Sequence, residues 1–389
     1  MRSPRPSQRS RSSLFRVGVQ LLVLILLAAF VIWCGSNLAQ NQSQRGFTLR
    51  FDFLDNPAGF TVTETVIPYS SRDTYAKALL VGFLNTLRVT AAGLVLATVL
   101  GISVGLGRLS RNWLVRKLAL IYVETLRNLP LLLVLVFGYA AVLLSLPPAD
   151  RPLSLGGLIF LQRQGTVIPW GVPTDSFWVG GGAGLGGMAA AIACLKWLTR
   201  RREQQGGLPL FFWGLPLVVL LLPMGLALLY TQGELPLILS VPRRHGTVIE
   251  GGLKLAPEFL ALLLPLSLYS AAFIAEIVRA GVTAVPRGQR EAAQSLGLPG
   301  WLVMARVIFP QALRVIVPPL TSQYLNLAKN TSLGVAVGFP DLYAIASPTL
   351  NQTGRPVEVL LLLMLTYLSL SLILSLAMNL YNRTLAWEP

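Results

Sequence analysis

Eight long apolar stretches constrain this chain more than any other feature of its sequence. They cover approximately residues 15–34, 79–107, 119–146, 177–198, 209–230, 257–280, 312–337 and 356–381. A bilayer core requires about 20 predominantly apolar residues per helix, which each stretch supplies. Only 12% of the residues are charged, against about 25% in an ordinary soluble domain. The sequence therefore predicts an all-α polytopic membrane protein with about eight transmembrane helices.

The first stretch, residues 15–34, is open to two interpretations. Basic residues precede it, as in a secretory signal peptide. They are Arg2, Arg5, Arg9, Arg11 and Arg16. However, the stretch is long for a signal core, no clear small-residue cleavage site follows, and Ile32 and Trp33 are too bulky for lipoprotein cleavage at Cys34. We therefore expect a retained membrane helix.

The distribution of basic residues predicts the orientation of the chain. They gather in the N-terminal tail and in residues 108–117, 196–202 and 279–314, whereas acids largely offset them in loops such as 35–77. Cytoplasmic loops of membrane proteins carry the excess of Lys and Arg. We expect an inner-membrane protein with both termini in the cytoplasm. The net charge of +16 then reflects topology, and no nucleic acid partner is expected.

Residue types that build catalytic or metal sites are scarce. The two cysteines, Cys34 and Cys194, lie in or beside apolar stretches, and the single histidine, His245, lies in a loop without ligand partners. No Gly-Lys pair exists, so no phosphate-binding loop of the G-x-x-x-x-G-K-[ST] type is present. We expect no metal, no bound cofactor and no enzyme activity of this chain.

The stretches and loops suggest seven segments. They are a basic cytoplasmic tail (1–14), an extra membrane helix (15–34), a periplasmic amphipathic segment (35–78), the first part of a core (79–146), an insertion with two membrane helices (147–256), the second part of the core (257–381) and a cytoplasmic tail (382–389). The loop 147–176 is rich in Pro and Gly, so we expect it to be irregular.

The segment 280–310 is the most informative loop. Pro286 suits the first turn of a helix, Glu291, Ala292 and Ala293 favour helix, and Gly297 suits its C-terminal end. A second short helix, Trp301 to Ile308, should end ahead of Pro310. The product is a compact helical elbow in the cytoplasm, with a flat alanine surface that a partner can contact closely.

This elbow resembles the loop of binding-protein-dependent ABC importer permeases. That family carries E-A-A, three residues, Gly, nine residues and then I-x-L-P. Here Glu291-Ala292-Ala293 precedes Gly297, and Val307-Ile308-Phe309-Pro310 follows after nine residues. The resemblance implies that the loop couples the permease to a cytoplasmic ATPase. The coupling residues it identifies are Pro286, Gly288, Gln289, Glu291, Ala292, Ala293, Gly297 and Pro310.

Further motifs resemble the polar amino acid branch of this family. They are Gly82-Phe-Leu-Asn85-Thr86-Leu87, Tyr122-Val-Glu124-Thr-Leu-Arg127-Asn-Leu-Pro130, Ala275-Glu276-Ile-Val-Arg279-Ala-Gly281, Pro310-Gln311-Ala312-Leu313-Arg314 and Tyr324-Leu-Asn326-Leu-Ala-Lys329-Asn330-Thr331-Ser332-Leu333. The family core of about five helices would correspond to the second, third, sixth, seventh and eighth stretches. The extra N-terminal helix and the insertion resemble the larger permeases of general L-amino acid transporters.

The resemblance implies a transport subunit that imports polar L-amino acids by alternating access. Its implied partners are a dimer of ABC ATPase subunits that hydrolyses the ATP, a second related permease in a heterodimer, a periplasmic amino-acid-binding protein, and membrane lipid. An ion-coupled secondary transporter of small polar solutes remains the alternative, and it would need neither ATPase nor elbow. A permease for another solute, such as an inorganic ion, is a third possibility.

Polar residues inside the seventh stretch form the candidate substrate path. They are Asn326, Lys329, Asn330, Thr331 and Ser332. In one interpretation the helix breaks here, and its backbone and side chains meet the carboxylate of an amino acid. In the other, Lys329 satisfies carbonyl groups of neighbouring helices and never contacts substrate.

Other charged residues in the apolar stretches have structural interpretations. Glu276 and Arg279, like Glu124 and Arg127, are three residues apart and share a helix face, so each pair is a candidate structural ion pair. We expect Arg88 to extend toward the membrane interface. Asn85 and Thr86 are interpreted as helix-packing contacts.

Overall fold

Membrane-length helices dominate the structure, a computed structural model that describes residues 8–45, 49–205, 214–245 and 248–385. Within these residues six helices are long and apolar enough to cross a bilayer, and one bent helix pair would make a seventh span. The polytopic helical fold is therefore confirmed. The predicted span 209–230 begins outside the described residues. Residues 1–7 and 386–389, which belong to the two predicted tails, also lie outside them.

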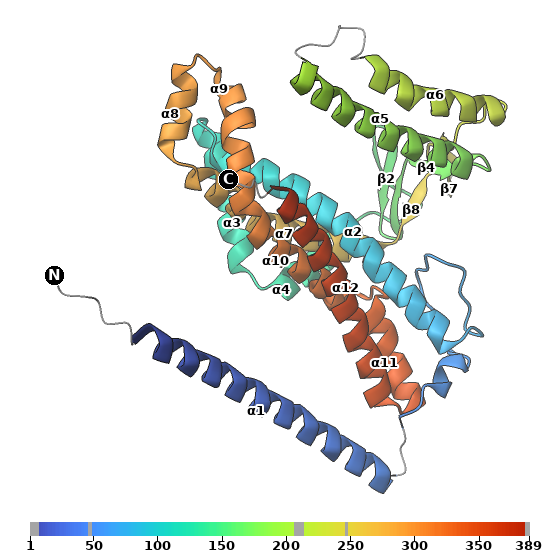
Figure 1. Cartoon of the computed structure of the whole chain (residues 1–389). Helices are drawn as coiled ribbons and strands as arrows, with labels where there is room; N and C mark the ends of the chain where they lie inside the picture. The colour runs from blue at the N-terminus through green and yellow to red at the C-terminus, as the bar shows by residue number, and fades with distance from the viewer. Residues whose placement is uncertain (1–7, 46–48, 206–213, 246–247, 386–389) are drawn as a thin grey trace.

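The elements follow one another along the chain as labelled in Figure 1. The helices are α1 Gln8–Arg45, η1 Asp52–Asp55, α2 Tyr75–Arg108, α3 Trp113–Asn128, α4 Leu131–Phe137, η2 Gly138–Leu143, α5 Phe177–Gln205, α6 Leu215–Tyr230, α7 Pro257–Ala284, α8 Arg287–Ser295, α9 Gly300–Leu302, η4 Val303–Ile308, α10 Phe309–Asn330, η5 Thr331–Val337, α11 Leu342–Thr353 and α12 Pro356–Leu385. The strands are β1 Leu153–Leu155, β2 Ile159–Gln162, β3 Gly165–Ile168, β4 Trp170–Pro173, β5 Leu237–Ser240, β6 Arg243–His245, β7 Val248–Glu250 and β8 Leu253–Leu255.

The two helices α2 and α7 pack side by side and form the centre of the core. Glycines of α2 allow this approach, because small residues let membrane helices come close. A Cβ atom on Gly101 would lie 2.6 Å from the Cβ of Ile274, and one on Gly105 would lie 2.8 Å from the carbonyl oxygen of Ala275. Gly281 of α7 lies close to Ile316 of α10, so α10 packs against α7 as well.

The predicted span 119–146 is not one straight helix. It consists of α3 and α4, which are bent by 107° at a break that contains Pro130. Proline cannot donate a backbone hydrogen bond and drives the preceding residue into extended backbone, and Leu129 has a ψ of 141°. Both arms contact α7: the hydroxyl of Tyr122 donates to the carbonyl of Leu268 at 2.6 Å, and Gly138 lies against Pro265.

The expectation of an irregular loop at 147–176 is wrong. This loop and residues 237–255 form short antiparallel strands in three sheets, ordered β1-β2-β3-β8, β4-β5 and β6-β7. Each ladder pairs backbone groups that the loop would otherwise leave unsatisfied. Because β8 runs directly into α7, the first sheet joins the insertion to the core. The β-branched and aromatic residues of Ile159–Gln162 and Gly165–Ile168, which favour strands, were the overlooked signal.

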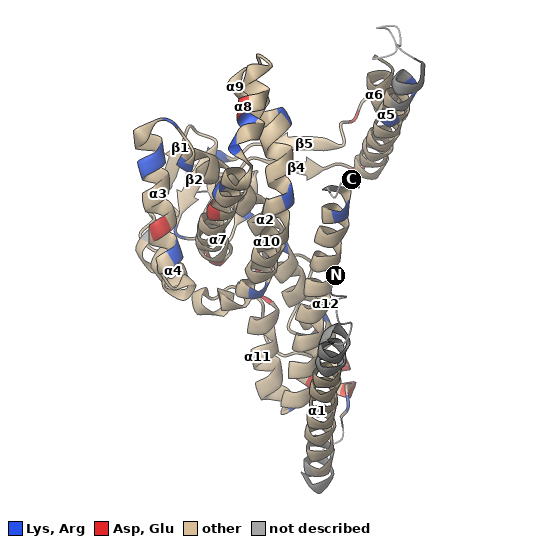
Figure 2. Cartoon of the chain, turned by 60° about the vertical axis from the view of Figure 1, so that its left-hand side comes forward, with Lys and Arg blue, Asp and Glu red and all other residues tan. Residues whose placement is uncertain are grey.

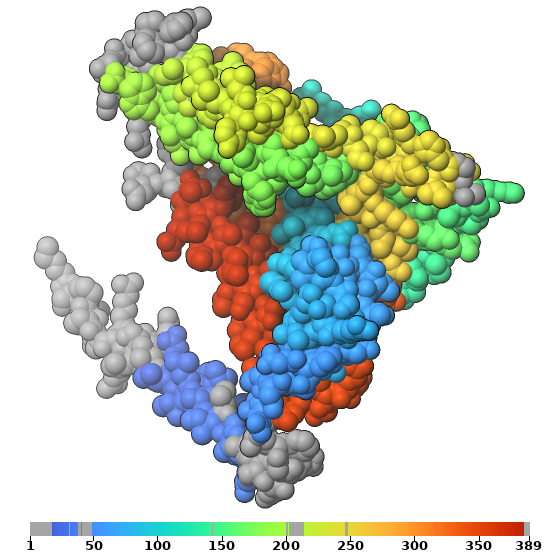
Figure 3. Space-filling model, turned by 90° about the vertical axis from the view of Figure 1, so that its right-hand side faces the viewer, coloured from blue at the N-terminus to red at the C-terminus, as the bar shows by residue number. Residues whose placement is uncertain are grey.

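The helices α5 and α6 pack against each other within the insertion. Gly187 of α5 lies close to the backbone of Leu220. Figure 3 shows the insertion, coloured green to yellow, on one side of the molecule, with α1 extending separately from the rest. The apolar window of α1 has no buried residue, and that of α5 is only 11% buried.

Within the predicted amphipathic segment 35–78, α1 continues to Arg45 and residues 49–74 form a strap across the end of α2. Phe53 and Ala58 are buried against Tyr75 and against residues of α11 and α12. Glu64 accepts from Arg88 at 2.6 Å, and the guanidinium of Arg88 lies 4.1 Å from the centre of the Phe259 ring. The sequence did not indicate these two partners of Arg88, because both come from segments distant along the chain.

Asn85 and Thr86 connect α2 to the segment before α11, as the sequence indicates for packing contacts. The Asn85 amide donates to the carbonyls of Glu64 and Pro340, both at 2.9 Å. The Thr86 hydroxyl accepts from the backbone N–H of Leu342 at 3.0 Å. These bonds hold the strap, α2 and α11 together at one end of the molecule, which we call the α11 end. Figure 1 places α8 and α9 at the opposite end, called the elbow end.

Candidate functional site

The first arm of the elbow is the short helix α8. It begins directly after Pro286 and ends at Ser295. Gly297 has a φ of +77°, a left-handed conformation that favours glycine at a helix end. Its N–H donates to the carbonyl of Gln294 at 2.9 Å. The sequence predicts this helix and its end.

The second arm differs from the prediction of a separate helix that ends ahead of Pro310. Helix α9, the π-helical turn η4 and α10 follow one another without a break, and Pro310 lies in the first turn of α10. Proline crowds the carbonyl four residues earlier, and a π turn widens the helix at that point. The elbow is therefore continuous with a membrane-length helix that runs from Gly300 to Val337.

One face of α8 is fixed and the other is open. Ala293 is buried against the second arm, together with Val303, and Gln311 donates to the side-chain oxygen of Gln289 at 3.2 Å. Glu291 and Ala292 are exposed. Leu296 and Trp301, at the tip of the elbow, are 81% and 70% exposed. Sequence reasoning missed these two residues, although large apolar residues beside a polar helix were a visible signal.

A charged cluster lies beside the elbow. Arg279 contacts the carboxylate of Glu276 at 2.6 Å, and Arg108 from the end of α2 binds the same carboxylate. The structure thus brings Glu276 and Arg279 together and adds Arg108, a partner that helix spacing cannot reveal. Among the described residues Glu124 makes no ion pair with Arg127, whose guanidinium lies 5.4 Å from the centre of the Phe273 ring.

The polar segment of the seventh stretch coincides with a change of helix type. Helix α10 ends at Asn330, a 3₁₀ helix covers Thr331–Val337, and Gly338 follows with a φ of +77°. The Thr331 hydroxyl donates to the carbonyl of Ala328 at 2.8 Å, and the Ser332 hydroxyl donates to the carbonyl of Lys329 at 2.9 Å. These hydroxyls therefore satisfy local backbone groups where the helix tightens.

Some polar side chains of α10 are exposed instead of packed against the core. Asn326 and Lys329 are exposed, Asn330 is partly exposed and Thr331 is fully buried. Ser322 is also exposed, and with Asn326 and Lys329 it follows the i, i+4, i+7 spacing of a single helix face. Sequence reasoning missed Ser322, although this spacing would have identified it. Within the described part of the chain Lys329 has no ion-pair partner closer than 4.0 Å.

Asp341, which lies between two membrane spans, is a buried carboxylate that sequence reasoning also missed. It caps α11 by accepting from the N–H of Ala344 at 2.8 Å, and it accepts from the Tyr367 hydroxyl at 3.1 Å. Burial raises the pKa of Asp341 to about 6, since desolvation disfavours the charged form. Burial likewise raises the pKa of Glu64, despite its ion pair with Arg88.

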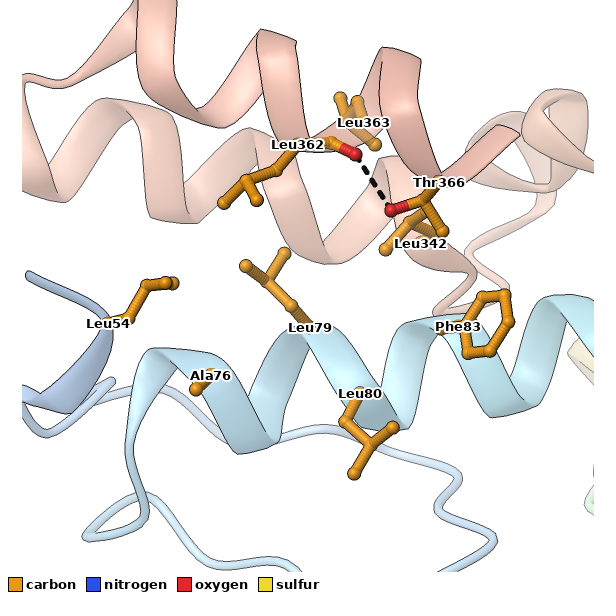
Figure 4. Close-up of a pocket in the computed structure, with 9 residues that line it drawn as sticks. All are labelled: Leu54, Ala76, Leu79, Leu80, Phe83, Leu342, Leu362, Leu363 and Thr366. Carbon is orange, nitrogen blue, oxygen red and sulfur yellow. Dashed lines mark hydrogen bonds between the residues drawn. The ribbon is translucent and has the colours of Figure 1, made fainter. Parts of the chain in front are cut away.

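An apolar pocket of about 370 Å³ lies between α2 and α12. Figure 4 shows Leu79 and Phe83 of α2 facing Leu362 and Thr366 of α12, with Leu54 of the strap at one side. The Thr366 hydroxyl donates to the carbonyl of Leu362 at 2.7 Å, so it does not point into the pocket as a free polar group. The pocket therefore offers no polar contact to a hydrophilic substrate.

A comparison with protein families identifies the chain. The family described as "Binding-protein-dependent transport system inner membrane component" matches residues 182–387, which contain the elbow and the polar segment of α10. This chain belongs to that family. As an inner-membrane component of a binding-protein-dependent transport system, it is a multi-pass transport subunit.

Curated relatives of this transport subunit match almost its whole length. The general L-amino acid transport system permease protein AapQ of Rhizobium johnstonii is 42% identical, over 94% of this chain and 91% of the relative. The glutamate/glutamine/aspartate/asparagine transport system permease protein BztB of Rhodobacter capsulatus is 40% identical, over 95% of this chain and 93% of the relative. The resemblance to amino acid ABC transporter permeases is thereby confirmed, including the insertion.

Proposed function

We propose that this transport subunit imports polar L-amino acids across the inner membrane and is energised by a separate ATPase. The observation that carries the proposal is the elbow: it projects from the end of the core and continues directly into α10, the helix that bears the exposed polar face. An element of this form can transmit a movement of a bound partner to the membrane helices.

The ATPase dimer would bind the open face of the elbow. Glu291 supplies a carboxylate for charge-assisted hydrogen bonds, Ala292 leaves room for close approach, and Leu296 and Trp301 supply apolar area. The coupling residues are those identified from the sequence: Pro286, Gly288, Gln289, Glu291, Ala292, Ala293, Gly297 and Pro310. ATP is bound and hydrolysed by the partner, because this sequence lacks a phosphate-binding loop.

Two contacts would carry the movement inward. The buried Ala293 and the Gln289–Gln311 hydrogen bond join α8 to the start of α10. Gly281 joins α7 to α10 through Ile316. A displacement of α8 would therefore move α10 and α7 together. The 3₁₀ segment that begins at Thr331 would resist a change of shape less than an α-helix does, because its hydrogen bonds have poorer geometry.

The exposed face of α10 would line the substrate path. A lysine at bilayer depth is costly unless it faces water, a polar partner or a substrate. Lys329 would attract the carboxylate of the amino acid, and Asn326 and Asn330 would supply hydrogen bonds. Thr331 and Ser332 would shape the change of helix type without binding substrate. The path is completed by a second, related permease subunit, with which this chain forms a heterodimer.

The proposed orientation places the elbow end in the cytoplasm. Basic residues at the C-terminal end of α2, at the N-terminal end of α3 and in α8 lie at this end (Figure 2), and the C-terminal end of α12 lies there too. This distribution is typical of the cytoplasmic side. The α11 end would then face the periplasm, where a binding protein delivers the amino acid. The seven segments identified from the sequence, from the tail 1–14 to the tail 382–389, retain their proposed roles, with β-strands in the insertion.

The decisive test is uptake of radiolabelled amino acid by proteoliposomes that contain the purified complex. Wild type should require ATP and binding protein. The double variant Glu291→Lys, Gly297→Trp should assemble but lose ATP-driven uptake, because it reverses the charge of the open face and removes the left-handed turn. Glu250→Lys in β7, an exposed residue far from the elbow, provides the matched charge control and should keep uptake.

Two results would contradict the proposal. Uptake that runs on an ion gradient without ATP would favour the secondary transporter. Unchanged ATP-driven uptake in the elbow variant would show that the coupling surface lies elsewhere. Uptake of an inorganic ion in place of amino acids would retain the mechanism and change the substrate.

A further inference from the structure

A pocket of about 270 Å³ lies behind the elbow, where α7, α8, the end of α2 and the π turn η4 meet. Its apolar lining includes Leu109, Val285, Met304 and Ile308, and its basic lining consists of Arg287 and Arg290. The pocket is separate from the substrate face of α10 and from the exposed tip of the elbow.

The two arginines have no partner in the described part of the chain. Neither guanidinium lies within 4.0 Å of a carboxylate, and neither forms a hydrogen bond. Both side chains are exposed. By contrast, the neighbouring Arg279 and Arg108 are occupied by Glu276. Arg287 and Arg290 are therefore available to an anion from outside the chain.

The pocket has an apolar part and a basic part, as the binding site of an amphipathic anion would. Val282, Val285 and Ile308 come from the last turns of α7 and the turn before α10, so the apolar part lies on the side of the membrane helices. The arginines belong to α8, which lies beyond the end of α7. A ligand with acyl chains and a phosphate group can satisfy both parts, because basic pockets between membrane helices on the cytoplasmic side bind anionic headgroups.

We propose that this pocket binds the phosphate headgroup of an anionic phospholipid, with Arg287 and Arg290 as its ligands. The proposal rests on the cytoplasmic orientation of the elbow end given above. A lipid in this position contacts α7, α8 and η4 at once, and it occupies the angle between the elbow and the membrane helices. The elbow would thereby respond to the anionic lipid content of the inner leaflet.

The test is equilibrium binding of fluorescent phosphatidylglycerol to the purified full complex in a neutral detergent. Wild type should bind phosphatidylglycerol more tightly than phosphatidylcholine. Arg287→Gln with Arg290→Gln should weaken phosphatidylglycerol binding by about tenfold, because two basic groups at the headgroup layer are lost. Arg151→Gln with Arg243→Gln, an equal change of charge at exposed residues of the insertion, should leave binding unchanged.

A second variant keeps the test informative if the arginine changes impair folding. Met304→Trp narrows the apolar part without altering charge, so it should also weaken phosphatidylglycerol binding while elution of the complex in size exclusion stays normal. Equal binding of the two lipids, or binding that survives both pocket variants, would overturn the proposal. Displacement by millimolar inorganic phosphate would also overturn it, since the ligand would then be the free anion.

Discussion

Asp341 illustrates how a single side chain can be both necessary and costly. Its carboxylate caps α11 and accepts from Tyr367, yet it is fully buried, and no cation of the described residues forms an ion pair with it. A buried carboxylate favours its protonated form. Nothing in the sequence around Asp341 distinguishes it from an exposed helix cap, because its burial results from α2 and α12 rather than from its neighbours along the chain.

We expect Asp341→Asn to stabilise the protein at alkaline pH. The pKa of Asp341 is about 6 in the folded chain, above its ordinary value of 3.8, so wild-type stability falls as pH rises through this interval and stays lower above it. Asparagine keeps the cap without the charge. The gain should be about 3 kcal/mol at pH 8 and should become small near pH 4.

Thermal unfolding of both proteins in detergent, at pH 4.5 and pH 8, checks this expectation. The difference between variant and wild type is the relevant quantity, because other groups titrate in both proteins. A gain of equal size at both pH values would show that the side-chain charge is not the cause.

At the scale of helices, the sequence predicted what depends on local chemistry. The end of α8 at Gly297 and the two arms of the elbow follow from the order of residues along the segment. The shared face of Glu276 and Arg279 follows from their spacing on one helix. Arg108 joins Glu276 only because α2 packs on α7, and this contact has no signature in either segment. Pro130 is a helix breaker, but the apolar residues around it led to the prediction of one continuous span at 119–146. The polar face of α10 was predicted only in part: Asn326 and Lys329 were identified, but Ser322, one turn earlier on the same face, was not.

We expect that any side chain at Gly101 would disrupt the packing of α2 against α7. A valine there would place its Cβ 2.6 Å from the Cβ of Ile274, so the helices must separate or shift. We expect Gly101→Val to destabilise the protein by about 2 kcal/mol or more and to lower its melting temperature. Gly184→Val in α5, where a Cβ meets nothing within 4 Å, is the matched control.

Thermal unfolding monitored by circular dichroism distinguishes the two glycine variants. Equal melting temperatures for Gly101→Val and Gly184→Val would mean that the α2–α7 contact is less tight than the distances indicate. A lower melting temperature for Gly184→Val alone would instead point to an unseen contact of α5.

At the scale of the whole molecule, the chain divides into a tightly packed core and peripheral membrane elements. The core comprises α2, α3, α4, α7, α10, α11 and α12, while α1 and the α5–α6 hairpin bury little surface against it. Hydropathy predicted the membrane-length helices among these, because a bilayer requires long apolar segments, but it did not predict α11, which lies between the seventh and eighth stretches. It cannot tell a helix that packs on its own chain from one that lies apart.

Removal of the α5–α6 hairpin should leave the core folded. Strands β4 and β5 pair through Pro173 and Leu237, and the N–H of Thr174 donates to the carbonyl of Pro236 at 3.3 Å. The two ends of the hairpin are therefore adjacent. Replacing residues 175–235 by Asn-Gly, a favoured two-residue hairpin turn, should give a monodisperse protein with nearly unchanged melting temperature.

Size-exclusion chromatography and thermal unfolding in detergent provide the measurement. The deletion removes two membrane segments, so the orientation of the remaining helices is preserved. Aggregation of the shortened chain, or a large loss of helical signal beyond that of the deleted residues, would show that the hairpin supports the core.

Helix α2 is long enough that a small tilt at one end would produce a large displacement at the other. The helix has 34 residues, or about 51 Å at 1.5 Å per residue, which exceeds the thickness of a bilayer core. Its close approach to Ile274 of α7 at Gly101 divides this length unequally: about 10 Å of helix lies between this point and Arg108, and about 40 Å between it and Tyr75. A rigid tilt about Gly101 would therefore move the strap and α11 about four times as far as the end beside the elbow.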